Sequence, residues 1–390
     1  MPLTPGLPLY AVDPRHIGTM DWTQWQTHAV SGFSGYSGQA GSAGNAGTAG
    51  AAGQSGASGQ SGYSGVSAYS GQSGYSGLLV TDGVPITAGI NDGRLTLTSG
   101  TPVTTTDVAS ASTVYWTPYV GARIAVWSGS RWKLYEPGEQ SLTLSGMTSG
   151  KIYDIFVWDS GTGITLGRGP AWASDSTRGT GAGTTQLTTL DGVLVNAQSL
   201  TGIAGGVPCS ASYLGSLRAT SATTTCMTAR TPWLANHYHP VQIPVAILGS
   251  GFWNYTTHNF QTANNGNADG ASHSAIEILA PVPGRTVAVH LSVAAANGGG
   301  WVGVTVAISL DGTIVGTRTP GTTVPTLSSE SNNIYASPHA DYVGQPGLGY
   351  HTLTWLEASG ATGTTTWCGA ITIGNDSQNL QSGITGTIWA

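Results

Sequence analysis

Five carboxylate residues have the chemistry, though not the spacing, of a glycosidase acid pair. They are Glu136, Glu139, Asp154, Asp159 and Asp175. Such enzymes hold two carboxyl groups about 5–9 Å apart, and nothing in the sequence fixes any two of these residues at that distance. Because Asp154 shares a strand face with Phe156, solvated or turn roles are favoured. We therefore expect no catalytic residue, no cofactor and no enzymatic activity.

Two further patterns resemble metal sites, but each is incomplete. His237 and His239 lie two residues apart, on one face of a predicted strand, with no Cys, Asp or Glu adjacent. Asn265, Asn267 and Asp269 alternate loosely like a calcium loop, but only Asp269 is charged. We expect partly buried interface histidines, a turn-rich loop and no bound metal.

Two segments near the C-terminal end combine aromatic rings with planar hydrogen-bonding groups, as sugar-binding sites do. They are GFWNYTTHNF (251–260) and SSESNNIYASPHADYVGQ (328–345). We expect both to be exposed loops, and the candidate glycan-binding residues are Trp253, Asn254, Tyr255, Tyr335, His339, Asp341 and Tyr342. The alternative is that these aromatic rings pack at a threefold interface or onto a stalk.

A stalk is predicted by the glycine spacing upstream. From residue 32 to residue 77 glycine occupies every third position, with Ala68 as the exception. Helices repeat near 3.6 residues and strands at 2, whereas three wound polyproline-II chains require glycine at every third position. A Gly/Ser linker would lack this phase, and packed polyglycine-like helices remain an alternative. We predict a collagen-like triple-helical stalk over residues 31–77.

The stalk is predicted to be too unstable to assemble alone, because residues 32–77 contain no proline. Collagen-like sequences usually contain at least about 15–20% Pro or hydroxyproline, and an unfolded Gly-Ser-Ala chain loses much backbone entropy on ordering. A neighbouring domain must therefore hold three chains in register. We predict a homotrimer whose assembly depends on residues beyond 241.

Composition excludes several classes of partner. Only 8% of residues are charged and the net charge is −6, which argues against nucleic-acid binding. No apolar run reaches the roughly 18 residues of a membrane span, and residues 1–20 show no secretory signal. Cys209 and Cys226 could pair across a hairpin, but buried free thiols are favoured.

Residues 1–30 are predicted to be an extended attachment peptide. Four prolines disfavour a helix, and Trp22 and Trp25 supply aromatic anchors for a groove on a larger assembly. A frayed terminus is the alternative.

Residues 78–242 have the alternation of short strands. The segment RIAVWSGSRWKLY (123–135) predicts a hairpin around SGS. Residues 141–158 alternate on both sides of a turn, and Tyr153 after that turn resembles the tyrosine corner of fibronectin-like sandwiches.

These residues also support a family resemblance. The segments STVYWTPYVGARIAVWSGSRWKLY, IYDIFVW, AWASDSTRGT and YLGSLRATS resemble, in that order, a β-domain of structural proteins of tailed bacteriophages. The similarity covers roughly residues 110–242, and such domains often adjoin SGYSG-type repeats. The resemblance implies a virion fibre or related appendage and brings no catalytic residues.

Residues 243–390 predict a second β-domain, with alternation over 285–296 and 301–310 and a hairpin turn at Asp311-Gly312. About eight strands with long loops fit a jelly-roll-like sandwich that acts as tip and trimerisation domain.

Together these features predict an all-β homotrimer with a fibrous segment, located in the virion and assembled in the bacterial cytoplasm. Its predicted partners are other virion proteins, through residues 1–30, and a bacterial surface glycan or protein. The favoured function is a tail fibre or receptor-binding protein. The alternatives are a capsid-attached head fibre or decoration protein and, third, a glycan-depolymerising tailspike, whose long β-helix is not evident.

Overall fold

The computed structural model describes residues 89–203, 207–297, 303–316, 324–325, 337–360, 363–373 and 378–390. The predictions for the attachment peptide with Trp22 and Trp25, for the stalk and for Tyr335 lie outside these residues. Internal contacts divide the chain into Met1–Gly74 and Tyr75–Ala390, and all described residues belong to the second unit.

The described part of the chain is all-β, as predicted. Its regular elements are strands, apart from the 3-10 turn η3 (Ala263–Gly266). No described helix has the length and apolar character needed to cross a membrane.

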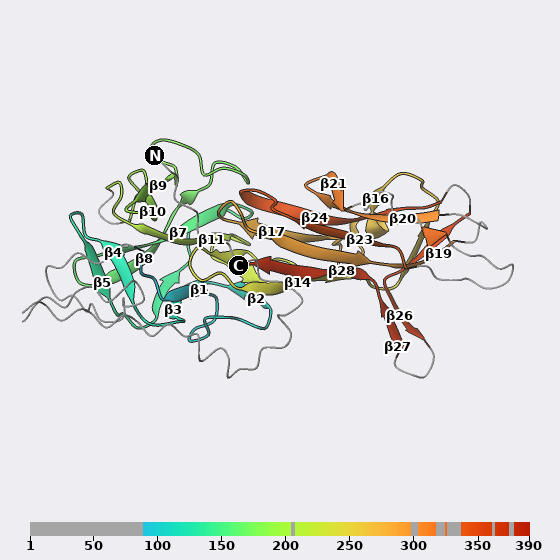
Figure 1. The fold of residues 1–390 in the computed structure, drawn as a ribbon, viewed down its shortest axis with the longest axis horizontal. Coiled ribbons are helices and arrows are strands. Elements are labelled where there is room, and N and C mark those ends of the chain that lie inside the picture. Colours follow the sequence, from blue (N-terminus) through green and yellow to red (C-terminus); the bar gives the residue numbers. More distant parts are fainter. Residues whose placement is uncertain are drawn as a thin grey trace, which may run out of the picture. The chain divides into compact units, whose positions relative to one another are not determined.

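The strands before residue 242 pair among themselves (Figure 1). One sheet has the order β1 (Gly93–Thr96), β3 (Thr113–Pro118), β6 (Gln140–Thr143). A second has the order β8 (Ile164–Ala171), β7 (Ile152–Asp159), β11 (Ser212–Arg218), β10 (Val193–Asn196), β9 (Leu187–Leu190), with β13 (Leu234–Asn236) beside β11. Two pairs complete this half: β4 (Ile124–Trp127) with β5 (Trp132–Tyr135), and β2 (Val108–Ala111) with β12 (Thr225–Met227).

The later strands form separate sheets. One has the order β14 (Gln242–Leu248), β28 (Gly383–Trp389), β18 (Val287–Ser292), β23 (His339–Gly344), and the red β28 lies beside β14 in Figure 1. Another has the order β16 (Gln261–Thr262), β24 (Gly349–Ala358), β20 (Gly303–Leu310), β21 (Thr313–Gly316), with β17 (Ala275–Ala280) on β24 and β22 (Val324–Pro325) on β20. The remaining strands are β15 (Phe252–Tyr255), β25 (Thr365–Cys368) and β19 (Ala294–Asn297) in one sheet, and the pair β26 (Ala370–Ile373) and β27 (Gln378–Gln381).

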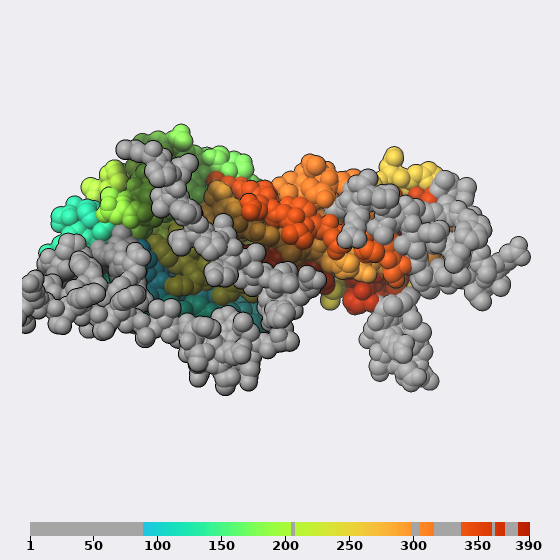
Figure 2. Space-filling model, in the orientation of Figure 1, coloured from blue at the N-terminus to red at the C-terminus, as the bar shows by residue number. Residues whose placement is uncertain are grey.

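Among the described strands, none of β1–β13 pairs with any of β14–β28. The strand pairing therefore changes at β14, which begins at Gln242, whereas internal contacts keep Tyr75–Ala390 as one unit. The domain boundary at residues 242/243 stays a prediction. The largest core cluster follows the same division, because its buried members lie between Ile243 and Ala390. Strand β24 alternates buried and half-buried residues, and the surface over this strand is visible in orange-red in Figure 2.

Alternation in the sequence correctly predicts which side chains are buried in these strands. Val287, Val289 and Leu291 of β18 enter the core. The two predicted hairpins are also confirmed: β4 pairs with β5 from Ile124 opposite Tyr135 to Trp127 opposite Trp132, and β20 pairs with β21. Asp311 and Gly312 between β20 and β21 have φ of 50° and 86°, as a type I′ turn requires.

Tyr153 has the geometry that its position after a turn suggests. It is buried in β7, and its hydroxyl oxygen accepts a hydrogen bond from the backbone N–H of Thr148 at 2.7 Å. This bond to a residue just upstream is the contact that defines a tyrosine corner.

The surroundings of Gly215 explain why the segment YLGSLRATS has a glycine at this position. Strand β11 lies between β7 and β13 there, and its pairing with β7 shifts between Tyr213 and Gly215. A Cβ atom on Gly215 would lie 2.3 Å from the backbone oxygen of Ala235. Backbone atoms cannot rotate away as a side chain can, so no larger residue fits.

We therefore expect Gly215→Ala to lower the free energy of unfolding by about 1–3 kcal/mol, the usual cost of overpacking. Urea unfolding of the full chain measures this change. Gly138→Ala is the matched control, because its new Cβ would meet no atom within 4 Å. Equal stability of the two variants would contradict the close approach of β13 to β11.

Candidate functional site

Asp154, the acidic residue of the segment IYDIFVW in β7, is the centre of a buried polar cluster, so its expected solvated or turn role is wrong. Asp154 is 0% exposed. Its carboxylate accepts hydrogen bonds from Arg178 Nε at 2.7 Å and Trp172 Nε1 at 3.0 Å. Thr185 and Ser216 donate two further bonds, at 2.8 and 2.5 Å. A buried carboxylate is stable only when paired and fully hydrogen-bonded, so this cluster is structural.

Arg178 links this cluster to the later strands. The guanidinium lies 4.2 Å from the ring centre of Trp172, and its Nη2 donates to the carbonyl oxygen of Pro281 at 2.8 Å. Burial alone would lower the pKa of Arg178, but the charge of Asp154 and the hydrogen bonds leave it raised. The residues behind the phage resemblance (Asp154, Trp172, Arg178, Tyr213) thus meet at one point.

The other candidate carboxylates behave differently from Asp154. Asp159 has the expected turn role, because its Oδ1 accepts a bond from the N–H of Gly161 at 2.8 Å. Glu139 accepts bonds from Ser99, Gly100 and Thr117 at 2.5–2.6 Å.

Segment 251–260 is only in part the exposed loop that the sequence predicts: residues 256–260 are exposed and lie outside a strand, but the first half is a strand with a buried Trp. Residues 252–255 form β15, paired with β25 and joined through it to β19. Trp253 is buried within the core, Tyr255 is half-buried against it, and Asn254 is exposed. The ring of Trp253 is therefore not available for stacking on a sugar.

Trp253 and Tyr255 instead enclose Glu357 of β24. The indole Nε1 of Trp253 donates to Glu357 Oε2 at 2.8 Å, and the Tyr255 hydroxyl donates to the same oxygen. Trp355 and Trp367 pack edge-on or tilted against these two rings. Burial raises the pKa of Glu357 to about 8, although the hydrogen bonds partly offset this rise.

Of the predicted residues in β23, His339 and Asp341 lie on the outer face of its sheet, whereas Tyr342 faces the core. Nδ1 of His290, on the neighbouring β18, lies 2.6 Å from Asp341 Oδ1, and both side chains are nearly half exposed. The ring centre of His339 is 5.8 Å from that of His290. Tyr342 is half-buried and packs against the core. His339 and Asp341 therefore share a face with His290, in a different sheet from that of Asn254.

The incomplete metal patterns have local explanations. The ring of His237 packs against Tyr213 and Tyr238, and burial next to Arg285 lowers its pKa to about 4. Asp269 Oδ1 accepts bonds from the N–H groups of Ala271 and His273, as expected for a turn-rich loop. Within the described residues no cluster of three His, Cys, Asp or Glu could hold a metal.

The three cysteines are free. Cys226 is buried, as expected, whereas Cys209 is half-buried, and Cys368 is also buried. Burial raises the pKa of the Cys226 thiol and raises that of Cys368 to about 11.

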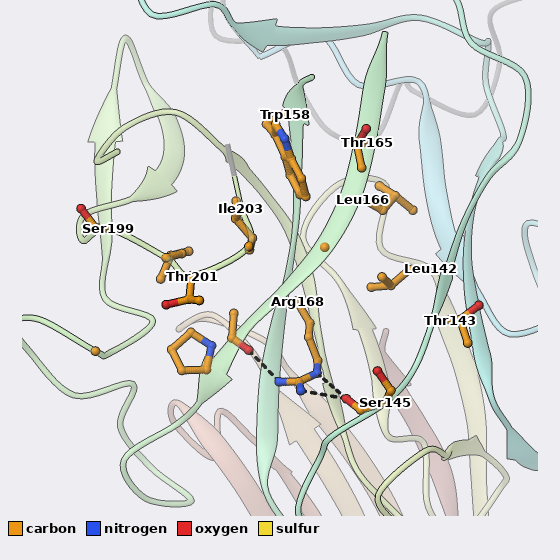
Figure 3. A pocket seen from close by; sticks show the side chains of 16 residues that line it. Leu142, Thr143, Ser145, Trp158, Thr165, Leu166, Arg168, Ser199, Thr201 and Ile203 are labelled. Carbon is orange, nitrogen blue, oxygen red and sulfur yellow. Dashed lines mark hydrogen bonds between the residues drawn. The ribbon is translucent and has the colours of Figure 1, made fainter. Parts of the chain in front are cut away.

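A pocket of about 550 Å³ lies beside β8, the edge strand of its sheet (Figure 3). Four separate segments line it: β6 with Ser145, the β7–β8 pair, Gly183, and residues 199–203. The sequence analysis missed this pocket. Its signal in the sequence was Gly167 and Gly169 inside a strand, where glycine often marks a close approach.

Comparison with known proteins gives one family match. Residues 30–89 match the collagen triple helix repeat, which supports the collagen-like character of the predicted stalk. No curated protein matches the chain.

Solved structures give only distant likenesses. The insecticidal delta-endotoxin Cry8Ea1 of Bacillus thuringiensis has 10% identity and a TM-score of 0.22, over 76% of this chain and 51% of that one. A Bacillus thuringiensis Cry1Da tryptic core variant has 11% identity and a TM-score of 0.16, over 71% and 48%. Infectious bursal disease virus Gx strain has 11% identity and a TM-score of 0.15, over 78% and 68%. The chain spans about half the length of the two endotoxins, and scores this low support no functional transfer.

Glu357 makes stability depend on pH. Its folded pKa of about 8 exceeds the unfolded value of about 4.3, so the folded chain holds a proton that the unfolded chain has lost. We expect the free energy of unfolding to fall as pH rises between these values, by at most about 1.4 kcal/mol per pH unit. Stability at still higher pH no longer depends on this group.

Chemical unfolding at a series of pH values tests this expectation. Glu357→Gln mimics the neutral acid and should flatten the decline, whereas the exposed control Glu136→Gln should retain it. An unchanged slope in Glu357→Gln would show that Glu357 does not hold the extra proton.

Proposed function

We propose that the chain is a homotrimeric fibre protein of a bacteriophage particle, a tail fibre or receptor-binding protein that binds the bacterial surface without catalysis. Residues 1–30 attach it to other virion proteins, residues 31–77 form the stalk, and residues 78–242 and 243–390 form two β-sandwich domains. The observation that carries the proposal is the collagen-repeat match at 30–89 immediately before a compact all-β unit.

The phage assignment rests on the resemblance over residues 110–242. Support comes from the Asp154 cluster, in which residues from three of the segments that carry the resemblance, IYDIFVW, AWASDSTRGT and YLGSLRATS, contact one another. Residues that must meet to compensate one buried carboxylate are expected to occur together in a domain family.

The trimer contact is proposed for the outer face of the sheet β14-β28-β18-β23. Val343 is 72% exposed, Leu248 46% and Trp389 38%. Strand register aligns Pro244, Thr387, Ala288 and Val343 in one row across this face. The four strands contain no Lys or Arg, and their only carboxylate, Asp341, is paired with His290.

Such a face suits identical copies, because apolar and hydroxyl side chains can meet their own kind without charge repulsion. A stalk of three chains brings three copies of this unit together. An exposed apolar patch of this kind is also typical of interfaces rather than of monomer surfaces.

Val343→Asp should therefore dissociate the trimer, because each interface would bury a carboxylate without a counter-charge. Sedimentation equilibrium of the full chain measures the oligomeric state. Val120→Asp is the matched control, because Val120 is 63% exposed and lies outside this sheet. A trimer that survives Val343→Asp as well as the control would place the contact elsewhere.

The function is tested on the particle itself. Antibodies against the chain should label the virion tail in electron micrographs, and purified full chain should reduce phage adsorption by about tenfold or more through trivalent competition. Labelling of the capsid would replace this proposal with the head-fibre alternative. Unlabelled particles and unchanged adsorption would overturn the fibre assignment.

A further inference from the structure

The pocket beside β8 has one wall made of Trp158 and small residues. A Cβ atom on Gly167 would lie 2.7 Å from the six-membered ring of Trp158, so the indole packs directly against the glycine backbone. Leu200 and Ile203 join Trp158 in the same cluster of apolar side chains. Figure 3 shows Trp158, Ile203 and Thr165 around this part of the pocket.

Hydroxyl groups surround that apolar wall, on Thr143, Ser145, Thr165, Ser199 and Thr201. Within the described residues none of these hydroxyls has a hydrogen-bond partner. Each hydroxyl can both donate and accept, so the pocket offers several unused hydrogen-bonding groups beside an indole ring. A polyhydroxylated ring with one apolar face is the complementary ligand.

Arg168 gives the pocket its charge, because it is the only ionisable residue in the lining. Its Nε and Nη2 donate to the carbonyl oxygen of Ser145 at 3.1 and 2.8 Å, and Nη1 donates to that of Gly169 at 3.2 Å. The guanidinium also lies over the ring of Tyr153, 4.7 Å from its centre. Among the described residues no carboxylate pairs with Arg168.

A fixed guanidinium without a counter-ion attracts an anionic group. The carbonyl contacts hold the group in place (Figure 3), so little entropy is lost when a ligand binds. Neutral carbonyl partners, unlike a carboxylate, leave the positive charge uncompensated.

From these contacts we propose that the pocket binds an anionic sugar, one or two residues of a polysaccharide with a carboxylate or phosphate group. The volume of about 550 Å³ lies within the roughly 300–1,000 Å³ of small-ligand pockets. Trp158 is only 8% exposed, so the sugar lies beside the small part of the indole that lines the pocket and does not stack on its face. The sugar hydroxyls bind the Ser and Thr side chains, and the anionic group lies toward Arg168. This inference deepens and rests on the proposed surface-recognition function.

Calorimetric titration of the full chain tests the proposal with three probes. They are a galacturonic acid trimer, a neutral galactose trimer and glucose 6-phosphate. We expect the acidic trimer to bind about tenfold more tightly than the neutral one, because only it forms a charge-assisted contact. Binding of glucose 6-phosphate would extend the site to phosphorylated glycans, whereas equal affinity for all three probes would refute the role of Arg168.

Thr165 is the position for a charge test, because it is half-buried in β8 and its side chain has no partner to lose. Thr165→Glu should weaken the acidic trimer about tenfold relative to Thr165→Gln, which has the same size without the charge. The exposed Ser130→Glu, outside the pocket lining, should bind like the unaltered chain. Equal affinity of the Glu and Gln variants, or no binding of either acidic probe, would overturn the proposal.

The outcomes separate this inference from the fibre assignment. If the chain blocks adsorption but binds none of the sugars, the pocket proposal fails and the fibre function stands. If the acidic trimer binds and Thr165→Glu weakens its binding relative to Thr165→Gln, the pocket stands even when the chain is absent from the particle.

Discussion

A carboxylate without access to water requires a counter-charge and hydrogen bonds for both its oxygens, and Asp154 obtains these from residues far apart in the chain. Arg178, Trp172, Thr185 and Ser216 all donate to it. The loop that contains Trp172 and Arg178 must therefore fold back against β7 and β11. Arg178 then donates to the carbonyl oxygen of Pro281, which connects the same loop to the end of β17. Loss of Arg178 would leave a buried charge uncompensated, and loss of Trp172, Thr185 or Ser216 would remove a hydrogen bond from it, so these segments depend on one another.

The second half of the chain also buries a carboxyl group, but stabilises it in a different way. Glu357 is as deeply buried as Asp154, but its partners are the neutral groups of Trp253 and Tyr255. Without a cation nearby, burial favours the protonated acid and raises the pKa. The aromatic rings around it therefore serve the core, although their composition is also that of a sugar site.

The proposed trimer contact and the proposed ligand pocket both use surface residues outside the two carboxylate clusters just described. The outer face of the sheet β14-β28-β18-β23 offers apolar and hydroxyl groups in a flat row, which suits a second copy of the chain. The pocket at the edge strand β8 is concave and has a single cation, which suits a small anionic ligand. These two surfaces lie in different halves of the described chain, so the proposed trimer contact and the proposed ligand site use separate residues.

The sequence by itself determined the features that follow local rules. Alternation identified the buried residues of β18 and β20. The SGS segment predicted the β4–β5 hairpin, and Asp311-Gly312 predicted the turn after β20. The period of three predicted the collagen-like segment. These patterns depend only on neighbours two or three positions apart, where backbone geometry is decisive.

Only the tertiary structure decided which polar and aromatic side chains are buried and which partners they bind. A Trp with Asn and Tyr beside it fits a sugar site or a core equally well. Trp253 is buried because β15 packs into the core, where its indole N–H meets Glu357 of a distant strand. Asp154 likewise looked solvated until four separate residues surrounded it. The pocket required β6, β8 and residues 199–203 to come together. Burial and hydrogen bonding depend on which strands pack against each other, and no spacing within one strand contains that information.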